Sequence, residues 1–350
     1  MKMTFRWFGK DDPVTLEKIR QIPVINGIVT ALDTPPGEVW ENEQIKKLKK
    51  DINDKGLDFE VVESVPVHED IKLGLSSRDK YIENYITTIK RLAKEGVKVI
   101  CYNFMPVFDW MRSNLNKTNQ DNSTSLAYDN DTVNKLNPLN LSEDLNLPAW
   151  DKSIGKERMK ELLKIYSEFT EERFFDNLKY FLQKVIPAAE QANIKMAIHP
   201  DDPPWSIYNL PRIIGNFNNL KKFLSLYDSP SNGITFCTGS FGCSQKNDLY
   251  DMIKLAKGKI HFVHMRNVLI TSEKSFQETA HPSKCGSMDM YKVLKTLYDN
   301  GFDGYIRPDH GRQIWGEQGN RAGYGLYDRA LGAMYLYGLM EAIIKGGKND

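Results

Sequence analysis

Strand-like and helix-like segments alternate eight times along the 350 residues of the chain, and this alternation most strongly constrains its fold. A helix after each strand predicts a parallel sheet. Eight such units without a composition break predict a single α/β domain over residues 1–350, closed as a (β/α)8 TIM barrel. An open doubly wound sheet would require a glycine-rich turn after the first strand, and Phe8-Gly9-Lys10-Asp11 contains one glycine. The strands are expected at residues 5–9, 24–30, 58–65, 97–104, 194–199, 233–237, 260–266 and 304–307.

The pattern is interrupted between about residues 112 and 150, a stretch that holds nine asparagines and few periodic apolar positions. An irregular segment of this length is uncommon inside a compact domain. We therefore predict an insertion after the fourth strand, with a small hairpin around residues 125–128. Apolar periodicity predicts helices at about residues 13–19, 39–55, 77–95, 156–192, 248–256, 288–300 and 327–345, and one more after Pro211.

The composition excludes several classes of protein. A formal net charge of +1 argues against nucleic-acid binding, which requires a basic excess or a clustered basic stripe. The N-terminal residues lack the apolar core of a signal peptide, and no run reaches the roughly 18 apolar residues of a membrane span. Four cysteines in so long a chain do not suggest a disulfide framework. We expect no nucleic-acid or membrane partner and a location in a reducing cytoplasm.

A potential metal ligand stands at or just past the carboxyl end of each of the last four expected strands. These residues are His199, Cys237, His264 and Asp309. In a barrel these strand ends meet at one face, so the four side chains converge. Each alone has an ordinary structural explanation, as a hydrogen-bonded core histidine, a small buried cysteine or a capping aspartate. Their coincidence favours a metal site, although this mixed ligand set leaves both zinc and manganese open.

His261 serves as an internal comparison for this argument. It lies three residues before His264, so strand alternation directs it to the opposite side of the sheet. We therefore expect His261 to be structural and not a ligand. The other cysteines lack a Cys-x-x-Cys spacing, which argues against a structural zinc ribbon.

Several motifs together resemble the mannonate dehydratase family of hexuronate catabolism. They are Tyr102-Asn-Phe-Met-Pro106, Ala197-Ile-His-Pro-Asp-Asp-Pro-Pro204, Phe236-Cys-Thr-Gly-Ser240, His264-Met-Arg-Asn267, Arg307-Pro-Asp-His-Gly-Arg312 and Gly323-Tyr-Gly-Leu-Tyr-Asp-Arg329. The resemblance runs from Arg6 to the last helix. It implies a xylose-isomerase-like barrel, a homodimer, a catalytic Mn²⁺ (with Fe²⁺, Co²⁺ or Zn²⁺ as alternatives), and conversion of the sugar acid D-mannonate to 2-keto-3-deoxy-D-gluconate and water.

Carried over to this chain, the resemblance places the metal ligands on the four residues already identified by strand position. It places the acid–base pair on His310 and Tyr324. The reference pKa of histidine, about 6.5, suits proton transfer near neutrality, whereas tyrosine, at about 10, stays protonated. The sequence leaves open which of the two is the base. Ala322 stands where the family pattern has proline, which could loosen the loop that holds Tyr324.

A polyhydroxy acid also requires residues that hold it, and arginine is the natural partner of a carboxylate. The candidates are Arg6, Asn103, Arg266, His281 and Arg312; ordinary ion pairing at the barrel rim is the alternative explanation for each. Asp201 and Asp202 could orient His199, but we favour a simple turn before Pro203-Pro204.

Three other functions remain open at this point. Divalent-metal sugar isomerases and epimerases on related barrels use carboxylate-rich ligand sets, which the Cys237 position disfavours. An apurinic-site nuclease would need a multi-zinc cluster and a basic face. A non-catalytic sugar-acid binding protein would not need a base placed like His310.

Overall fold

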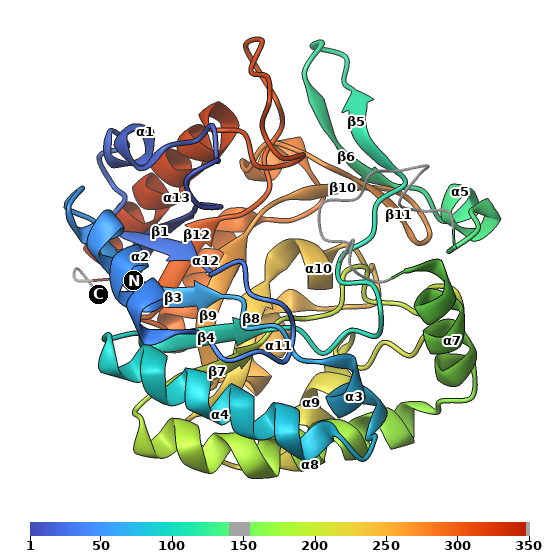
Figure 1. Cartoon of the computed structure of the whole chain (residues 1–350). Helices are drawn as coiled ribbons and strands as arrows, with labels where there is room; N and C mark the ends of the chain where they lie inside the picture. The colour runs from blue at the N-terminus through green and yellow to red at the C-terminus, as the bar shows by residue number, and fades with distance from the viewer. Residues whose placement is uncertain (140–154, 348–350) are drawn as a thin grey trace.

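The computed structural model of the chain describes residues 1–139 and 155–347. Eight parallel strands close into a barrel in the spatial order β1-β12-β9-β8-β7-β4-β3-β2, with β1 paired to both β12 and β2 (Figure 1). This confirms the predicted TIM barrel. The barrel strands are β1 (Lys2–Arg6), β2 (Gly27–Thr30), β3 (Asp58–Glu63), β4 (Val99–Tyr102), β7 (Lys195–Ile198), β8 (Asn232–Cys237), β9 (Ile260–Met265) and β12 (Tyr305–Pro308).

One helix follows each barrel strand and covers the outside of the barrel (Figure 1). These helices are α1 (Leu16–Arg20), α2 (Asn42–Asn53), α4 (Arg78–Lys94), α8 (Glu171–Gln191), α9 (Phe217–Leu226), α11 (Leu249–Leu255), α12 (Met290–Asp299) and α13 (Tyr327–Gly346). Further helical segments are α3 (Glu69–Leu73), α5 (Asn130–Lys135), α7 (Lys156–Ser167), α10 (Thr238–Gly242) and the 3₁₀ turn η1 (Ser283–Cys285).

The interior of the barrel changes from apolar to polar along the strands. An inner cluster fills the middle of the barrel and consists of Val29, Val61, Val99, Cys101, Ala197 and Phe262. Residues two positions apart on a strand share one face of the sheet. The next inner position after Ala197 is therefore His199, and the next after Phe262 is His264. The packed apolar layer thus forms a floor beneath polar side chains at the carboxyl ends of the strands.

A second, antiparallel sheet stands beside this mouth, in the order β10-β11-β6-β5 (Figure 1). Strands β5 (Asn114–Thr118) and β6 (Thr124–Tyr128) form a hairpin inserted after β4. Strands β10 (Val268–Ser272) and β11 (Ser275–Glu278) form another hairpin after β9. The two hairpins join where Phe276 and Gln277 pair with Tyr128 and Ala127.

The structure corrects several sequence expectations. The helix expected at 156–192 is two helices, because Thr170 caps the start of α8 by accepting a hydrogen bond from the backbone N–H of Arg173. The insertion at 112–150 is not irregular up to residue 139, since it contains the hairpin expected near residues 125–128 and α5. Its remainder, residues 140–150, lies outside the described residues. The β10–β11 hairpin was not predicted, and the barrel strands are mostly shorter than expected.

The helices of the described residues do not meet the requirements of a membrane span. None of those within residues 1–139 and 155–347 combines the length and apolarity needed to cross a bilayer.

Candidate active site at the mouth of the barrel

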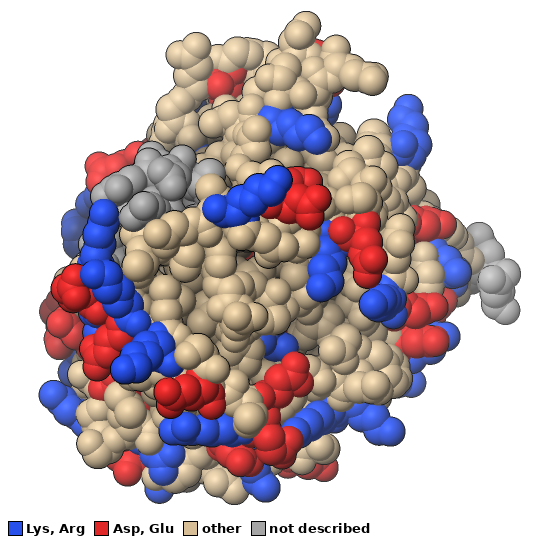
Figure 2. Space-filling model, turned by 90° about the vertical axis from the view of Figure 1, so that its right-hand side faces the viewer, with Lys and Arg blue, Asp and Glu red and all other residues tan. Residues whose placement is uncertain are grey.

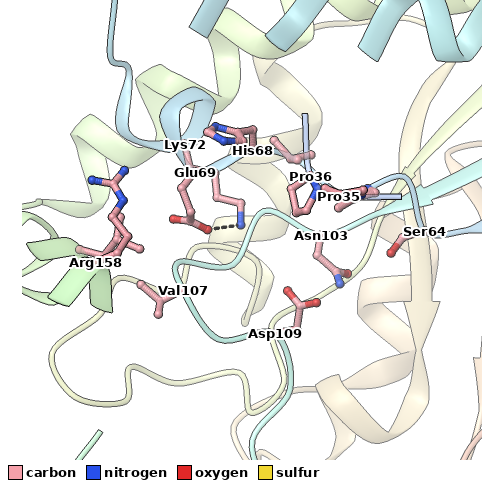
Figure 3. Close-up of a pocket in the computed structure, with 13 residues that line it drawn as sticks. Pro35, Pro36, Ser64, His68, Glu69, Lys72, Asn103, Val107, Asp109 and Arg158 are labelled. Atoms are coloured by element: carbon pink, nitrogen blue, oxygen red, sulfur yellow. Dashed lines mark hydrogen bonds and ion pairs between the residues drawn. The ribbon is translucent and has the colours of Figure 1, made fainter. Parts of the chain in front are cut away.

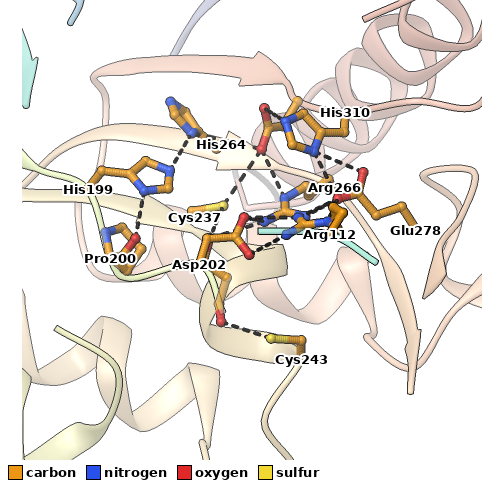
Figure 4. Close-up of polar contacts among 12 residues, drawn as sticks. Arg112, His199, Pro200, Asp202, Cys237, Cys243, His264, Arg266, Glu278 and His310 are labelled. Carbon is orange, nitrogen blue, oxygen red and sulfur yellow. Dashed lines mark hydrogen bonds and ion pairs between the residues drawn. The ribbon is translucent and has the colours of Figure 1, made fainter. Parts of the chain in front are cut away.

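Three of the four predicted metal ligands lie together at the barrel mouth. Donor atoms of His199, Cys237 and His264 all lie within 4.8 Å of one another (Figure 4). Nε2 of His199 is 3.2 Å from Nδ1 of His264. Asp309, the first residue after β12, places Oδ2 3.7 Å from the Cys237 sulfur and 3.9 Å from Nδ1 of His264. The strand ends therefore bring all four side chains together, with Asp309 at the margin of the cluster.

Local contacts prepare these atoms to bind a cation. Nδ1 of His199 donates to the carbonyl oxygen of Pro200 at 2.7 Å, which directs Nε2 toward His264. Burial would raise the pKa of the Cys237 thiol, but Arg266, His199 and His264 hold it well below its usual range. Burial would lower the pKa of His199, but Cys237 raises it to about 9, so a cation bound here would displace a proton from this ring. A low thiol pKa and two imidazole nitrogens in contact make this donor set suitable for a divalent ion.

His310, which is buried, and Tyr324, which is half-buried, form a pair beside the cluster. Nε2 of His310 is 3.0 Å from the Tyr324 hydroxyl, and Nδ1 of His310 is 2.9 Å from each carboxylate oxygen of Glu278. Burial, assisted by Asp309, raises the pKa of Tyr324, which keeps the phenol protonated. The indole of Trp110 lies against the His310 ring, with centroids 5.6 Å apart.

Gly323 makes the contact between these two residues geometrically feasible. Its φ of +80° lies in the left-handed region that favours glycine. A Cβ at this position would stand 2.7 Å from a methyl carbon of Leu126 and 3.3 Å from Cγ of His310. Only a residue without a side chain lets the chain pass here, and the turn directs Tyr324 onto His310 even though Ala322 replaces the expected proline.

A buried network of four charged residues supports the pair (Figure 4). Arg112 binds both carboxylate oxygens of Asp202 at 2.8 and 3.0 Å and reaches Glu278 at 2.6 Å. Arg266 contacts Asp202 and Glu278 at 2.6 Å each. Two arginines thus alternate with two carboxylates, all at most 3% exposed. Removing one partner from such a network leaves a buried charge unpaired and costs about 3–5 kcal/mol.

The arginines keep both carboxylates of this network ionised. Burial would raise the pKa of Asp202, but Arg112 and Arg266 hold it well below its usual range. Burial would also raise the pKa of Glu278, but His310, Arg266 and Arg112 lower it to about 2. Asp202 is therefore part of a charge network and not the simple turn residue that we favoured from the sequence. Asp201 accepts a hydrogen bond from the backbone N–H of Ile214, and neither aspartate orients His199 by a direct hydrogen bond.

A second set of buried charges lies on the inner faces of β3 and β12. Arg307 reaches Glu63 at 3.0 Å and Asp309 at 2.7 Å. The other oxygen of Glu63 stands 3.3 Å from Nε2 of His264. Burial would raise the pKa of Glu63, but Arg307 and His264 hold it well below its usual range. These contacts hold two candidate ligands, Asp309 and His264.

Of the five candidate substrate residues, Asn103, Arg6 and Arg312 line open space. Asn103 borders a cavity of about 320 Å³ between α3, α7 and the loops after β2, β3 and β4, where Figure 3 shows it near Asp109. Arg6 lines a groove of about 730 Å³, and its guanidinium lies over the ring of Phe8. Figure 2 looks onto this side of the molecule from the carboxyl ends of the strands, where charged side chains surround a largely uncharged centre.

Arg266 and Arg312 are held in ion pairs, whereas neither ring nitrogen of His281 has a hydrogen-bond partner among the described residues. Arg266 is fully buried in the network and also contacts Asp309 at 3.0 Å. Arg312 bridges Asp121, at 2.8 Å, and Asp328, at 2.9 Å. His281 is buried against α13, where a Cβ on Gly332 would stand 2.4 Å from its Nδ1.

His261 lies apart from the cluster, at the amino end of β9 beside Lys195 and Lys259. The pairing of β8 with β9 shifts register between Ile234 and Thr235, so strict alternation of side chains along β9 does not hold at His261. Burial lowers the pKa of His261 to about 3, so the ring is neutral.

Sequence reasoning missed Arg112, Glu278, Glu63 and Arg307. Two of them carried a readable signal. Glu63 follows the inner residue Val61 by two positions, and Arg307 precedes Asp309 by two. Arg112 and Glu278 carried none, since Arg112 reaches the site from the loop before β5 and Glu278 from the end of β11, both outside the barrel strands.

Known proteins resemble this chain over its full length. The family model of D-mannonate dehydratase (UxuA) matches residues 1–350. A mannonate dehydratase of Streptococcus uberis is 54% identical over 351 residues, covering 99% of this chain and 100% of that protein. A mannonate dehydratase of Thermotoga neapolitana is 55% identical over 356 residues, covering 99% of this chain and 98% of that protein. The crystal structure of mannonate dehydratase from Streptococcus suis serotype2 has a TM-score of 0.92 and 48% identity, covering 99% of this chain and 96% of that one.

The closed barrel, with candidate metal ligands and a histidine–tyrosine pair at the carboxyl ends of its strands, defines a TIM-barrel enzyme. The whole-chain match and identities above one half show that the chain belongs to the D-mannonate dehydratase family, a family of hydro-lyases.

Proposed function

We propose that this chain converts D-mannonate to 2-keto-3-deoxy-D-gluconate and water, with His310 and Tyr324 as its acid–base pair. The observation that carries the proposal is the 3.0 Å contact between Nε2 of His310 and the Tyr324 hydroxyl, placed directly beside the ligand cluster. Membership of the family supplies the substrate. The remaining residues supply the conditions that the reaction requires.

The proposed metal ligands are His199, Cys237, His264 and Asp309. Their fit to a divalent cation rests on the low pKa of the thiol, the 3.2 Å contact between two imidazole nitrogens and the adjacent carboxylate. We propose Mn²⁺, with Fe²⁺, Co²⁺ and Zn²⁺ as the alternatives. A divalent ion bound there would stabilise the negative charge that develops on the substrate when the C2 proton leaves.

We assign the base to His310 and the acid to Tyr324. The raised pKa of Tyr324 keeps its proton available for the departing C3 hydroxyl. His310 takes the C2 proton, the C2–H electrons form the C2–C3 double bond, and the hydroxyl leaves as water. The resulting enol then ketonises. Because the two residues are in contact, the proton can return from the imidazolium to the phenolate and reset both for the next turnover.

Arg6 and Asn103 are the proposed substrate-binding residues that border open space and form no ion pair with another described residue. Arg266 and Arg312 are held in ion pairs, so we propose that they act on the substrate through the residues they contact. His281, whose buried ring nitrogens have no hydrogen-bond partner among the described residues, is also proposed as a substrate-binding residue.

Two properties of the whole protein belong to the same proposal. We propose a homodimer, supported by an apolar stripe on α13 formed by Tyr327, Leu331, Met334 and Tyr337, each 41–49% exposed. We also propose that the enzyme works in the cytoplasm, because its four cysteines are free and Cys237 must stay reduced to bind a metal.

The proposed function is tested by metal-resolved turnover. The protein is stripped of metal, each of the four ions is restored separately, and formation of an α-keto acid from mannonate is followed. We expect Mn²⁺ to restore the highest rate. In parallel, His310→Asn should lose at least about 10²-fold in kcat while its metal content stays equal to wild type.

Absence of α-keto acid with every ion, or formation of a ketose in its place, would overturn the proposed reaction. Full activity of His310→Asn would remove only the assigned acid–base residue.

A further inference from the structure

We propose that Glu278 is a positioning residue that fixes the proton of His310 on Nδ1 and so leaves Nε2 free to act as the base. The inference rests on the proposed function, because it assumes that His310 transfers the proton. It goes beyond that function by assigning a catalytic task to a residue of the β10–β11 hairpin, outside the barrel.

The first step concerns which hydrogen bond Glu278 can make. An ionised carboxylate only accepts hydrogen bonds. Both of its oxygens stand 2.9 Å from Nδ1 of His310, so the imidazole must present an N–H there. In the neutral ring the lone pair then lies on Nε2, which accepts from the Tyr324 hydroxyl at 3.0 Å. Glu278, His310 and Tyr324 thus form one directed chain of hydrogen bonds.

The second step concerns what holds Glu278 in place. Its Oε1 accepts from Arg112 at 2.6 Å and from Arg266 at 2.6 Å. Guanidinium groups are donors only, so they require an acceptor at this position. The glutamate is 1% exposed, and water therefore cannot substitute for it. The two arginines therefore fix Oε1 on their side and hold the carboxylate of Glu278 against Nδ1 of His310.

The third step is that Glu278→Gln should invert the arrangement at His310. The arginines require the amide oxygen of the new side chain to face them. The amide NH₂ then takes the place of Oε2, 2.9 Å from Nδ1 of His310, and can donate to Nδ1. An N–H on Nδ1 would face the hydrogens of this NH₂, so we expect His310 to move its proton to Nε2 and to lose the lone pair that the base requires. The loss of the negative charge of Glu278 would not by itself predict that the proton of His310 moves from Nδ1 to Nε2.

Asp202→Asn is the matched control. Asp202 contacts the same two arginines as Glu278, and no direct hydrogen bond joins it to His310. Both substitutions convert one carboxylate of the four-residue network to an amide. Only the change at Glu278 alters the hydrogen-bond partner of His310.

The experiment combines kinetics with ¹⁵N NMR of histidine-labelled protein. The chain has six histidines, and His310→Asn identifies the resonances of His310 by difference. We expect Nδ1 to carry the proton in wild type and in Asp202→Asn, and Nε2 to carry it in Glu278→Gln. The kcat of Glu278→Gln should fall on the order of 10²-fold with KM little changed and metal content retained.

Glu278→Asp is the conservative variant and keeps an acceptor-only side chain. It should keep the proton on Nδ1 and retain more activity than Glu278→Gln. It also carries the test if Glu278→Gln does not fold, because a proton on Nε2 in Glu278→Asp would overturn the proposal.

Two further results would overturn the inference. One is a proton on Nδ1 of His310 in folded Glu278→Gln. The other is an equal loss of kcat in Asp202→Asn and Glu278→Gln. If His310→Asn abolishes turnover while Glu278→Gln retains full kcat, only the positioning role fails. If His310→Asn itself keeps full activity, His310 is not the base, and the role of Glu278 that depends on it fails as well.

Discussion

At the scale of the single residue, His261 has an energetic cost that depends on pH. Burial lowers its pKa to about 3, far below the 6.5 of an exposed histidine. Between these two values the unfolded chain binds a proton that the folded protein excludes. Stability is therefore unaffected by His261 above about pH 6.5 and is lost progressively as the pH falls through this window toward 3.

His261→Gln should remove this dependence. Lowering the pH from about 7.5 to about 5 should cost wild type about 2 kcal/mol more of its free energy of unfolding than it costs the variant. The difference arises because the glutamine of the variant does not titrate. Urea unfolding at the two pH values measures the difference. Parallel pH dependence in the two proteins would show that His261 is protonated at no cost in the folded state.

The four expected metal ligands all lie on one inner-face spacing of the barrel strands. His199, His264 and Asp309 could be predicted because each ends a strand of a barrel whose topology follows from the alternation of elements. Glu63 and Arg307 share that spacing but were not predicted, because the sequence does not show that a carboxylate on β3 and a guanidinium on β12 pair with each other. Glu278 could not be found, since its contact with His310 depends on how one hairpin pairs with another, which no local pattern encodes.

At the scale of elements, the β5–β6 hairpin fastens the loop that carries Tyr324. Thr124 and Gln313 exchange backbone hydrogen bonds at 3.1 and 2.8 Å. Arg312 links the hairpin turn at Asp121 to the first turn of α13 at Asp328. The hairpin itself was foreseen from the pattern near residues 125–128. Its partner β10–β11 was not, because Val268–Ser272 is largely exposed and lacks a clear apolar alternation.

Arg312→Met distinguishes this structural role from the direct substrate contact that the sequence suggested. If Arg312 positions the loop, displacement of Tyr324 should lower kcat on the order of 10- to 100-fold with KM little changed. If Arg312 binds the substrate carboxylate, KM should rise while kcat stays near wild type. Steady-state kinetics with mannonate measures both.

Asp121→Asn is the control for Arg312→Met, since it removes only the exposed half of the bridge. An exposed ion pair is worth about 0–1 kcal/mol, so kcat should fall less than about fivefold. A loss equal to that of Arg312→Met would place the whole effect in the hairpin contact and none in the contact with Asp328.

At the scale of the whole molecule, α13 is apolar on two sides. One side packs into the core through Ala333, Leu336 and Met340. The other exposes the stripe described above, and Trp315, 73% exposed, lies against its first residue with ring centroids 5.6 Å apart. A helix of a monomeric barrel needs only one apolar face. The second face is therefore expected to pack against the same stripe of another copy around a twofold axis.

Met334→Glu combined with Tyr337→Glu should separate the two copies, because four carboxylates would then face one another across the interface. Wild type should sediment at twice the chain mass of 40.2 kDa and the double variant at the single mass. Met334 and Tyr337 are exposed on α13 and are not among the proposed metal ligands. The separated subunits should therefore bind metal as wild type does. Lys179→Glu, an equal change of charge at an exposed position of α8, should remain dimeric. A monomeric wild type, or a double variant that still sediments as a dimer, would show that this stripe does not hold the copies together.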